Sequence, residues 1–464
     1  MAGGEASFTI WGGVAVYLTG VLALGLHAAR HVQDNADYLV AGRRLPLWLC
    51  TFTLFATWFG GGTAIGAAGA AYESGLLGVI ADPFGAALCL FLFGAFYAKV
   101  LRRLELLTVA DFFRHRFGGH AEPLAALCLI PAYVGWVGSQ FVAFGFILNA
   151  LTGVDTTLAI VGGAAFVILY TLAGGLWAVS LTDAVQAIVL TVGLAFLLGV
   201  VLTAPGGEGV LAQIPAERWR VLPDPGWPER LAWVQAWVVI GLGAIPSQDL
   251  LQRVLSARSD SVARASAHGA GLLYLTVGMI PVLLGMAGAV LLPDLANPEL
   301  VVPRLCLEWL SPIGVMIVLG ALLSAIMSSA DSALLAPAGI VSENLAPWLR
   351  PGLSGAARLR ISRAVVPTFG ALSLAVALLF ENVYDLMVNS WAVMLVSLLV
   401  PLTGGMVWKR PGRWAASGSM IVGLVAWAAL STVDMVWPAD LLAAGVCLIT
   451  FVALAWLPAR DASE

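Results

Sequence analysis

The segment Ser324-Ala-Ile-Met-Ser328-Ser329-Ala-Asp331-Ser332 places one acid and four hydroxyls late in an apolar run that is otherwise typical of a membrane helix. Four of these side chains recur at helical spacing and share one face: Ser324, Ser328, Asp331 and Ser332. Ser329 is rotated by about 100° from Ser328. An aspartate in hydrocarbon costs about 2.5–3.5 kcal/mol on insertion scales, which indicates a functional role. Carboxylate and hydroxyl oxygens suit an alkali cation better than zinc or copper. The alternative is that the serines pack helices closely and bond back to their own backbone.

The composition predicts that the whole chain is embedded in a membrane. Of 464 residues, 60% are hydrophobic and only 11% are charged, whereas a soluble domain has about 25% charged residues. The mean hydropathy is +0.93. Repeated apolar runs of about 20 residues predict an all-α polytopic membrane protein with about 13 transmembrane helices. We expect these spans near 8–30, 47–69, 75–101, 121–153, 156–174, 181–203, 231–254, 263–292, 309–343, 359–380, 383–408, 412–432 and 438–457.

The Lys and Arg residues predict the orientation of the spans. With the amino terminus outside and alternating spans, all but four of the 23 Lys and Arg fall on the cytoplasmic side, as the positive-inside rule requires. We therefore expect a multi-pass protein of the plasma or inner membrane with a cytoplasmic carboxyl terminus. The longest polar gap, 204–230, is then an external loop. The first span is too long, and its leading segment too poor in Lys and Arg, for a signal peptide.

Several function classes are disfavoured by the composition. The formal net charge is −4 and there is no basic tract, so nucleic acid is not an expected partner. The five cysteines are scattered singly, without metal or redox spacing. No Ser/His, Cys/His or metal constellation predicts an enzyme. Nothing in the sequence indicates an obligatory protein partner, and the lipid bilayer is the expected surrounding.

Two predicted spans are interrupted near their middle. One contains Trp58-Phe59-Gly60-Gly61-Gly62-Thr63, in which each glycine costs about 1 kcal/mol relative to alanine in a helix. The other contains Pro246-Ser247-Gln248-Asp249, in which proline removes a backbone donor and polar side chains follow. Unwound backbone at membrane depth is tolerated where it lines a cavity, and paired breaks in two halves of a chain indicate a transporter site. The alternative for the glycines is close helix packing.

Two further acids in predicted spans have both structural and functional interpretations. Asp183 is either a helix N-cap or first-turn acid, or a cation ligand opposite the serine stripe, or an acid on the inward exit path. Asp82, in Asp82-Pro83-Phe84, either satisfies a backbone amide freed by the proline or contacts a substrate.

Aromatic and polar residues near the first break allow the same two interpretations. Trp136 and Gln140 are one turn apart, and they either pack in the core or face a cavity. The face of Trp58 is suited to an ammonium group. The segment 108–117 has the pattern of a capping box that starts a short amphipathic helix on the inner surface.

These motifs resemble the sodium/solute symporter family, which includes the sodium-coupled proline, sialic acid, sugar and choline transporters. The resemblance runs from about residue 36 to 412 and rests on segments 36–44, 56–66, 108–117, 170–183, 245–256 and 324–332. It implies a leucine-transporter-like fold, in which a five-plus-five inverted repeat has one extra helix before it and two after. The chain, 1–464, is then one transporter domain, with repeats at about 47–203 and 231–408.

The resemblance also implies site residues, with Na+ as the coupling ion. In the family, the shared sodium site uses two carbonyls at the first core break, with a carbonyl and two hydroxyls of the eighth core helix. The matching residues here are Ala56, Phe59, Ala325, Ser328 and Ser329. A second sodium, present in some members, matches Asp183, Asp331 and Ser332. We expect solute contacts from Trp58, Gly60, Gly61, Gly62, Thr63, Asp82, Phe84, Trp136, Gln140, Ser247, Gln248 and Asp249.

Within the family, the motifs look most like those of the choline branch, with one departure. That branch has a tryptophan where this chain has Ser247, and another near Ser139 is also replaced. An aromatic cage for a quaternary ammonium would therefore keep Trp58 but lack the tryptophans at these two positions. A more polar zwitterion, amino acid or amine would suit the residues after Pro246 better.

The sequence therefore predicts sodium-coupled symport of a small organic solute by alternating access. The expected partners are the solute, sodium ions and lipid. One alternative is a proton-coupled transporter in which Asp183 or Asp331 carries the proton. The other is a sensor of the same fold that binds without pumping, although we expect no signalling domain after the last span.

Overall fold

The computed structural model describes residues 41–173, 176–380, 382–409 and 411–456, with six isolated positions between 12 and 23. The expected first span, 8–30, therefore lies almost entirely outside the described residues. Over the described residues the regular structure is helical, and the pairing of Leu45 with Ala257 is an isolated bridge rather than a sheet. The all-α expectation is confirmed for this part of the chain.

The helices of the first half follow the expected spans from 47 to 203. The α-helices are α3 (Leu47–Trp58), α4 (Ala67–Ser74), α5 (Ala86–Leu92), α6 (Ala98–Arg103), α7 (Val109–Phe117), α8 (Ala121–Thr152), α9 (Thr156–Ala173), α10 (Leu176–Thr203) and α11 (Val210–Gln213). Tighter or wider helical turns join them: η1 (Ala41–Arg43), η2 (Gly62–Gly66), η3 (Gly75–Val79), η4 (Ile80–Gly85), η5 (Phe93–Tyr97) and η6 (Ala216–Trp219). The expected loop 204–230 thus contains two short helices, α11 and η6.

The second half repeats the pattern of long helices with short interruptions. Its α-helices are α12 (Trp227–Gly241), α13 (Gln248–Ser256), α14 (Asp260–Thr276), α15 (Met279–Leu291), α16 (Val301–Trp309), α17 (Pro312–Ile340), α18 (Ala346–Leu349), α19 (Gly355–Ala377), α20 (Val383–Met394), α21 (Val400–Val407), α22 (Ala415–Leu430) and α23 (Ala439–Ala455). The connecting turns are η7 (Pro298–Leu300), η8 (Val341–Leu345) and η9 (Leu395–Leu399). Each expected span after the first overlaps at least one of these helices.

Many of the helices are long and apolar enough to cross a membrane. By length and composition, seven helical stretches among the described residues meet this condition, and four shorter apolar helices accompany them. The longest stretch, Gly62–Arg103, contains Gly75 with a φ of 63°, a value that favours glycine. This turn ends α4 and separates the second expected span from the third.

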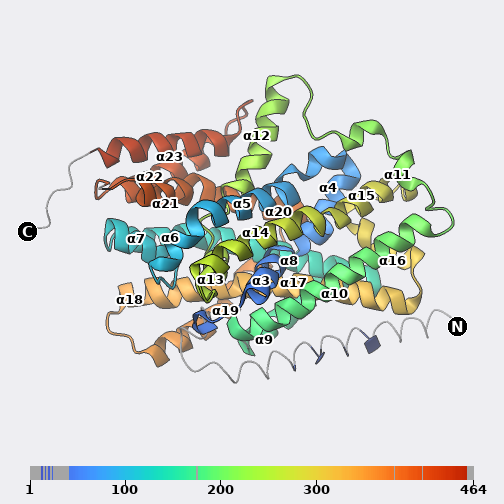
Figure 1. Ribbon diagram of the computed structural model, residues 1–464, viewed down its shortest axis with the longest axis horizontal. Coiled ribbons are helices and arrows are strands. Elements are labelled where there is room, and N and C mark those ends of the chain that lie inside the picture. Colours follow the sequence, from blue (N-terminus) through green and yellow to red (C-terminus); the bar gives the residue numbers. More distant parts are fainter. Residues whose placement is uncertain are drawn as a thin grey trace, which may run out of the picture.

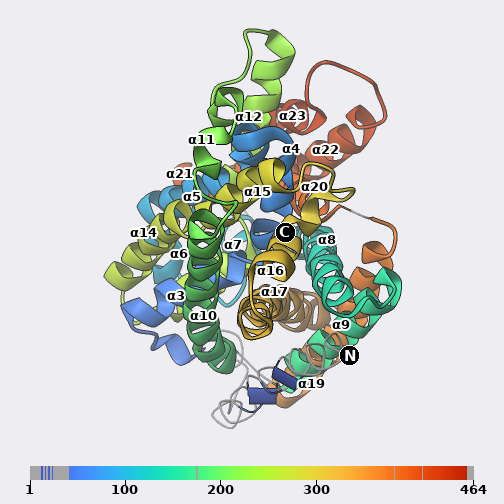
Figure 2. The same ribbon diagram turned by 90° about the vertical axis from the view of Figure 1, so that its right-hand side faces the viewer.

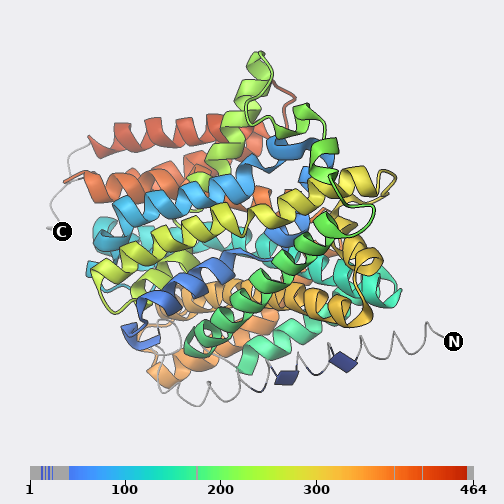
Figure 3. The ribbon, with the colours of Figure 1, turned by 45° about the vertical axis from the view of Figure 1, so that its right-hand side comes forward.

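The centre of the bundle is α17. Every residue from Val318 to Ile340 is buried, as expected for a helix that is apolar on most faces. It packs against α3, α8, α10 and α19, which surround it in the view nearly along its axis (Figure 2). The pair α22 and α23 lies at one edge of the bundle, and α9 and α19 lie at the opposite edge (Figures 1 and 2). The oblique view shows the long helices running side by side (Figure 3).

Both expected helix breaks are present. The first follows α3 at Phe59, whose φ of −75° and ψ of 75° are not helical, and the helix resumes at Gly61. The second lies between α12 and α13, where Ser247 is extended with a φ of −71° and a ψ of 141°. A third break, which we did not predict, occurs at Asp82, with a φ of −146° and a ψ of 123°. An extended residue before Pro83 is the usual conformation.

A smaller expectation, the capping box, is also confirmed. Thr108 and Asp111 form the capping box at the start of α7, because each side chain accepts the other's backbone N–H. The five cysteines are free thiols, and each is buried: Cys50, Cys89, Cys128, Cys306 and Cys447.

Candidate functional site

The first break is joined to α17 by two hydroxyls. The carbonyl of Ala56, near the end of α3, accepts hydrogen bonds from Ser328 Oγ at 3.3 Å and from Ser329 Oγ at 3.2 Å. Both serines are fully buried. Phe59 lies in the break itself, and Ala325 precedes Ser329 by one turn of α17. These five residues are the ones matched above to the shared sodium site, and three of them are in direct contact.

A buried charged cluster adjoins the same serines. Asp183 of α10 accepts hydrogen bonds from Ser328 Oγ and from Thr53 Oγ1, the latter at 2.5 Å. Its Oδ2 lies 3.9 Å from Arg253 Nη2, and both side chains are fully buried. Arg253 Nη2 also donates to Ser332. Asp183 is seven residues inside α10, which begins at Leu176, so the N-cap interpretation is wrong.

Asp331 completes this cluster with one free oxygen. Its Oδ1 accepts a hydrogen bond of 3.2 Å from Ser332 Oγ. Among the described residues, its Oδ2 has no hydrogen-bond partner, and the same is true of Nε and Nη1 of Arg253. Buried polar atoms without protein partners usually bind water or an ion. The cluster therefore offers a free carboxylate oxygen and hydroxyl oxygens on the buried face of α17.

The second break is organised around Asp249. Its Oδ2 accepts a hydrogen bond of 2.5 Å from the indole Nε1 of Trp58 on α3, and its Oδ1 accepts one from the phenol of Tyr133 on α8. The Tyr133 oxygen in turn accepts the backbone N–H groups of Gln248 at 2.7 Å and of Asp249 at 3.1 Å. One phenol thus satisfies the first two orphan amides of α13 and orients its carboxylate.

Three tryptophans from different helices pack together, and one of them, Trp58, donates to this carboxylate. The ring of Trp391 on α20 has its centroid 5.9 Å from that of Trp58 and 5.0 Å from that of Trp136. The ring of Tyr133 lies 6.0 Å from Trp136. We call Trp58, Trp136 and Trp391 the tryptophan cluster. Aromatic faces beside a carboxylate are the usual surroundings of a bound ammonium group.

The glycines of the first break agree with both interpretations made from the sequence, a break in the helix and close packing between helices. The N–H of Gly61 donates to Gln140 Oε1 at 2.7 Å. A Cβ on Gly60 would lie 2.4 Å from both Gln140 Oε1 and Ser329 Oγ, and one on Gly62 would lie 2.0 Å from Met387 Sδ. The glycines therefore allow close packing as well as the break.

Two expected solute residues point elsewhere. The amide of Gln248 accepts the N–H of Val109 at 2.7 Å and donates to the carbonyl of Leu107 at 3.0 Å, which ties α13 to the segment before α7. The ring of Phe84 faces Trp237, with centroids 6.3 Å apart. Ser247 Oγ is buried and has no partner among the described residues.

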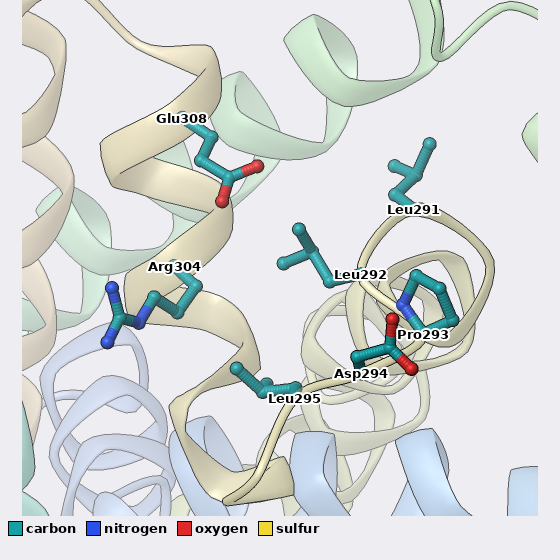
Figure 4. A pocket seen from close by; sticks show the side chains of 7 residues that line it. All are labelled: Leu291, Leu292, Pro293, Asp294, Leu295, Arg304 and Glu308. Atoms are coloured by element: carbon teal, nitrogen blue, oxygen red, sulfur yellow. The ribbon is translucent and has the colours of Figure 1, made fainter.

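Two cavities of about 370 Å³ each lie beside the loop that joins α15 to η7. One is lined by Leu291, Leu292, Pro293, Asp294, Leu295, Arg304 and Glu308, between α15 and α16 (Figure 4). The other, which we call the outer cavity, is lined by Gly66, Gly69, Ala70, Glu73, Ala296, Asn297, Pro298, Glu299, Asn382, Tyr384 and Asp385. The lining of the outer cavity joins η2 and α4 of the first broken helix to the start of α20.

Glu299 closes one side of the outer cavity. Its carboxylate accepts the N–H groups of Val383 at 3.0 Å and Tyr384 at 2.9 Å, the first amides of α20. Burial raises the pKa of Glu299 from 4.5 to about 7, while these two amides lower it and the charges of Asp385 and Glu73 raise it further.

Comparison with known proteins now decides the family. The sequence model of the sodium:solute symporter family matches residues 38–425, which is most of the chain. The chain belongs to this family. The symporter is 30% identical over 440 residues to the human high affinity choline transporter 1, covering 89% of this chain and 75% of that protein. It is 29% identical over 440 residues to the sodium/pantothenate symporter of Escherichia coli K12, covering 91% of this chain and 90% of that protein.

The fold is also shared with solved transporters. A sodium-coupled sialic acid symporter in a substrate-bound, outward-open state superimposes with a TM-score of 0.82 at 20% identity, covering 97% of this chain and 98% of that chain. The fold is therefore the expected leucine-transporter-like one. Family membership makes the chain a multi-pass membrane transporter, not an enzyme, and its activity is sodium-coupled symport of a small solute.

Sequence reasoning missed several residues that complete the symporter's candidate site. Tyr133 precedes Trp136 and Gln140 by one and two turns of α8, so helical spacing was an available signal. Arg253 is an ionisable residue in an expected span, which is itself a functional indication. Trp391 lies in an apolar span, and nothing in its local sequence separates it from a packing residue.

Proposed function

We propose that this symporter transports a small solute with an ammonium group, such as an amine, an amino acid or another zwitterion. The observation that supports the proposal is the tryptophan cluster beside the carboxylate of Asp249. A cation over an aromatic face gains about 0.5–2 kcal/mol, the more so when desolvated. A buried carboxylate adds the opposite charge that such a group requires.

The structure supplies aromatic walls that the sequence comparison with the choline branch did not anticipate. Trp391 and Trp136 stand around Trp58 from α20 and α8, although Ser247 replaces the tryptophan of that branch. The relatives alone leave the solute open, since one is named a choline transporter and the other a pantothenate symporter. The aromatic rings favour a cationic group over a carboxylate.

We assign sodium to the junction of the first break with α17. The proposed ligands are the carbonyls of Ala56, Phe59 and Ala325 and the hydroxyls of Ser328 and Ser329. Support comes from the two hydroxyls that already converge on Ala56 O within 3.3 Å, because an oxygen-only set of this kind suits an alkali cation. Sodium there would link α3 to α17 and order the break that follows Ala56.

The proposal for a second sodium uses Asp183, Asp331 and Ser332. Its support is the unpartnered Oδ2 of Asp331 in a fully buried cluster. Arg253 already neutralises one of the two carboxylates, and it lies 3.9 Å from Asp183. The same free oxygen would also suit a proton, which is the observation that favours a proton-coupled symporter as the second candidate.

The energy available per sodium is sufficient for accumulation. One charge moving down about 100 mV releases about 2.3 kcal/mol, and a tenfold sodium gradient adds about 1.4 kcal/mol. The sum of about 3.7 kcal/mol supports about 500-fold accumulation of a neutral solute.

In the proposed cycle, sodium binds first and the solute then binds between the two breaks. The residues expected to contact it are Trp58–Thr63, Ser247 and Asp249, with side chains of α8 and α20 around them. Closure of the outer side and rocking of the two repeats, 47–203 and 231–408, would release sodium inward past Asp183. We keep the external amino terminus and the plasma or inner membrane as part of this proposal.

A thermal-stability screen of the purified symporter tests the proposal. Amines, amino acids, sugars and carboxylates are each added in sodium or in potassium. A ligand at 100 times its Kd stabilises the folded state by about 2.7 kcal/mol. We expect stabilisation by solutes with an ammonium group and only in sodium. Stabilisation by sugars or simple carboxylates but by no amine would overturn the solute class, and equal stabilisation in potassium would overturn the sodium assignment.

A further inference from the structure

Asp82 is a buried carboxylate that the proposed site does not use. It lies at the third break, where its backbone is extended, and only 2% of its surface is exposed. Its Oδ2 has no hydrogen-bond partner, and no Lys or Arg pairs with it, among the described residues. An unpaired acid at this depth is costly, and such residues usually mark a binding or transport path.

The groups around Asp82 are hydroxyls rather than cations. Tyr384 on α20 accepts the Asp82 N–H at 3.3 Å. Thr63 on η2 lies beside Asp82 and 3.5 Å from the hydroxyl of Tyr274 on α14. Hydroxyls can orient a carboxylate, but they supply no charge to balance it.

Helix α20 relates Asp82 to the tryptophan cluster. Tyr384, Met387 and Trp391 are spaced by three and four residues, so they form one stripe along α20. Tyr384 contacts Asp82, Met387 packs on Gly62, and Trp391 reaches the tryptophan cluster. The two ends of the stripe are about 10 Å apart along the helix. Asp82 therefore lies about two turns from the cluster, toward the start of α20.

The same stripe begins at the outer cavity. Tyr384 and Gly66 both line that cavity, and the Tyr384 hydroxyl accepts the backbone N–H of Asp82. A solute that moves from the outer cavity to the tryptophan cluster would pass Asp82. Its free oxygen needs a hydrogen-bond donor as well as a positive charge. A protonated amine with N–H groups supplies both, whereas a quaternary ammonium supplies only the charge.

We propose that Asp82 is an ammonium-binding site between the outer cavity and the tryptophan cluster, and that it selects amines with N–H donors over quaternary ammonium compounds. This inference rests on the proposed function and names its solute class more narrowly. It gives Asp82 a role separate from that of Asp249, whose two oxygens already accept from Trp58 and Tyr133. The solute binds Asp82 on entry through its N–H groups.

The test measures the Kd in sodium of three probes that differ only at nitrogen: ethanolamine, N,N-dimethylethanolamine and choline. We expect the wild-type Kd to rise at least tenfold from the primary to the quaternary compound. In Asp82→Asn, the Kd of ethanolamine should rise about 10- to 100-fold, since a charge-assisted hydrogen bond is lost, while that of choline stays within twofold. The matched control is Asp434→Asn, an exposed acid between α22 and α23 that lines neither of the two cavities, which should leave the ratio unchanged.

The outcomes separate the two proposals. If the three probes bind with equal affinity, or if Asp82→Asn changes all three Kd values alike, amines are substrates but Asp82 does not select them. If no probe binds and another solute class does, the proposed function fails and this inference fails with it. Without ligand, Asp82→Asn should unfold at a higher temperature than wild type, because an unpaired buried charge is removed. If the Asn variant does not fold, Asp82→Ser serves the same comparison.

Discussion

The two breaks in the core helices are held in different ways. At the first, neutral groups hold the backbone: two serine hydroxyls bond the Ala56 carbonyl, and Gln140 bonds the Gly61 N–H. At the second, the Tyr133 phenol accepts two backbone amides and donates to the Asp249 carboxylate. When a cation binds, the serine hydroxyls and the Ala56 carbonyl can give up their hydrogen bonds to one another and coordinate the cation instead. The contrast suggests that the first break responds to an ion and the second is a fixed frame for the solute.

The strongest way to break this contrast is Tyr133→Phe. The substitution removes the donor to a buried carboxylate and leaves two buried N–H groups without an acceptor, so we expect the free energy of unfolding to fall by about 4 kcal/mol. The control is Tyr170→Phe, where the hydroxyl donates to Thr182 at 3.3 Å. Denaturant unfolding measures both. Equal losses in the two variants would mean that the second break is no more rigidly held than an ordinary buried tyrosine.

Glu299 packs closely against α4, the part of the first broken helix that follows the break. A Cβ on Gly69 of α4 would lie 2.8 Å from Glu299 Cγ. The pKa of Glu299 is about 7 in the fold against an ordinary 4.5, so the folded state binds the proton more tightly than the unfolded chain. Its stabilising contribution is therefore full below pH 4.5 and is lost as the pH rises through about 7.

The size of this pH effect is at most about 3 kcal/mol. Unfolding temperatures measured across this pH range should fall toward alkaline pH in the wild type, and Glu299→Gln should remove that part of the slope. Glu308→Gln, at an acid of the other cavity, should keep it. A Glu299→Gln variant with the wild-type slope would show that another group titrates.

Gln140→Leu tests the first break alone. It leaves the buried N–H of Gly61 without an acceptor, and we expect a loss of about 2 kcal/mol in unfolding free energy. Gln186→Leu is the matched control, since both polar atoms of Gln186 are buried without partners among the described residues. That control should not lower the free energy of unfolding, because it removes a buried amide that has no partner to lose. A larger loss in the control than in Gln140→Leu would contradict this account of the break.

Ser329→Ala gives the smallest expected effect and the most selective one. Sodium should need about a tenfold higher concentration to stabilise the protein, which corresponds to about 1.4 kcal/mol. Stability in potassium should change little. Ser256→Ala, which removes only a bond to the Gln252 carbonyl at 2.6 Å, is the control. Unchanged sodium dependence of uptake in Ser329→Ala would mean that the proposed sodium site is wrong.

Local chemistry made the two breaks predictable, and tertiary packing determined what they contact. Glycine and proline disfavour a helix wherever they stand, so the breaks near Gly60 and Pro246 were visible in the sequence. The third break had a signal as well, since the residue before Pro83 is biased away from the helix. The partners were less visible, because Tyr133 bonds the second break, and Trp391 packs on Trp58 beside the first, from helices far away in the chain.

The role of Asp183 could not be decided from the sequence, because it depends on where its helix begins. The expected span began at residue 181, which placed the acid in a first turn where an N-cap is common. The helix begins earlier, at Leu176, and so the carboxylate faces Thr53, Ser328 and Arg253 in the core. Boundary errors of a few residues are usual, and here one such error separated a cap from a buried ligand. The repeat boundaries and the orientation of the termini remain predictions.

The five buried thiols have a practical consequence for following the transport cycle. Because each natural cysteine is enclosed by protein, a water-soluble maleimide has no exposed sulfhydryl to modify in the folded symporter. A single cysteine introduced at Ala296, an exposed residue that lines the outer cavity, would then report its own accessibility without the natural residues being removed. The labelling rate at that position, read in sodium with and without solute, would time the opening of the outer side.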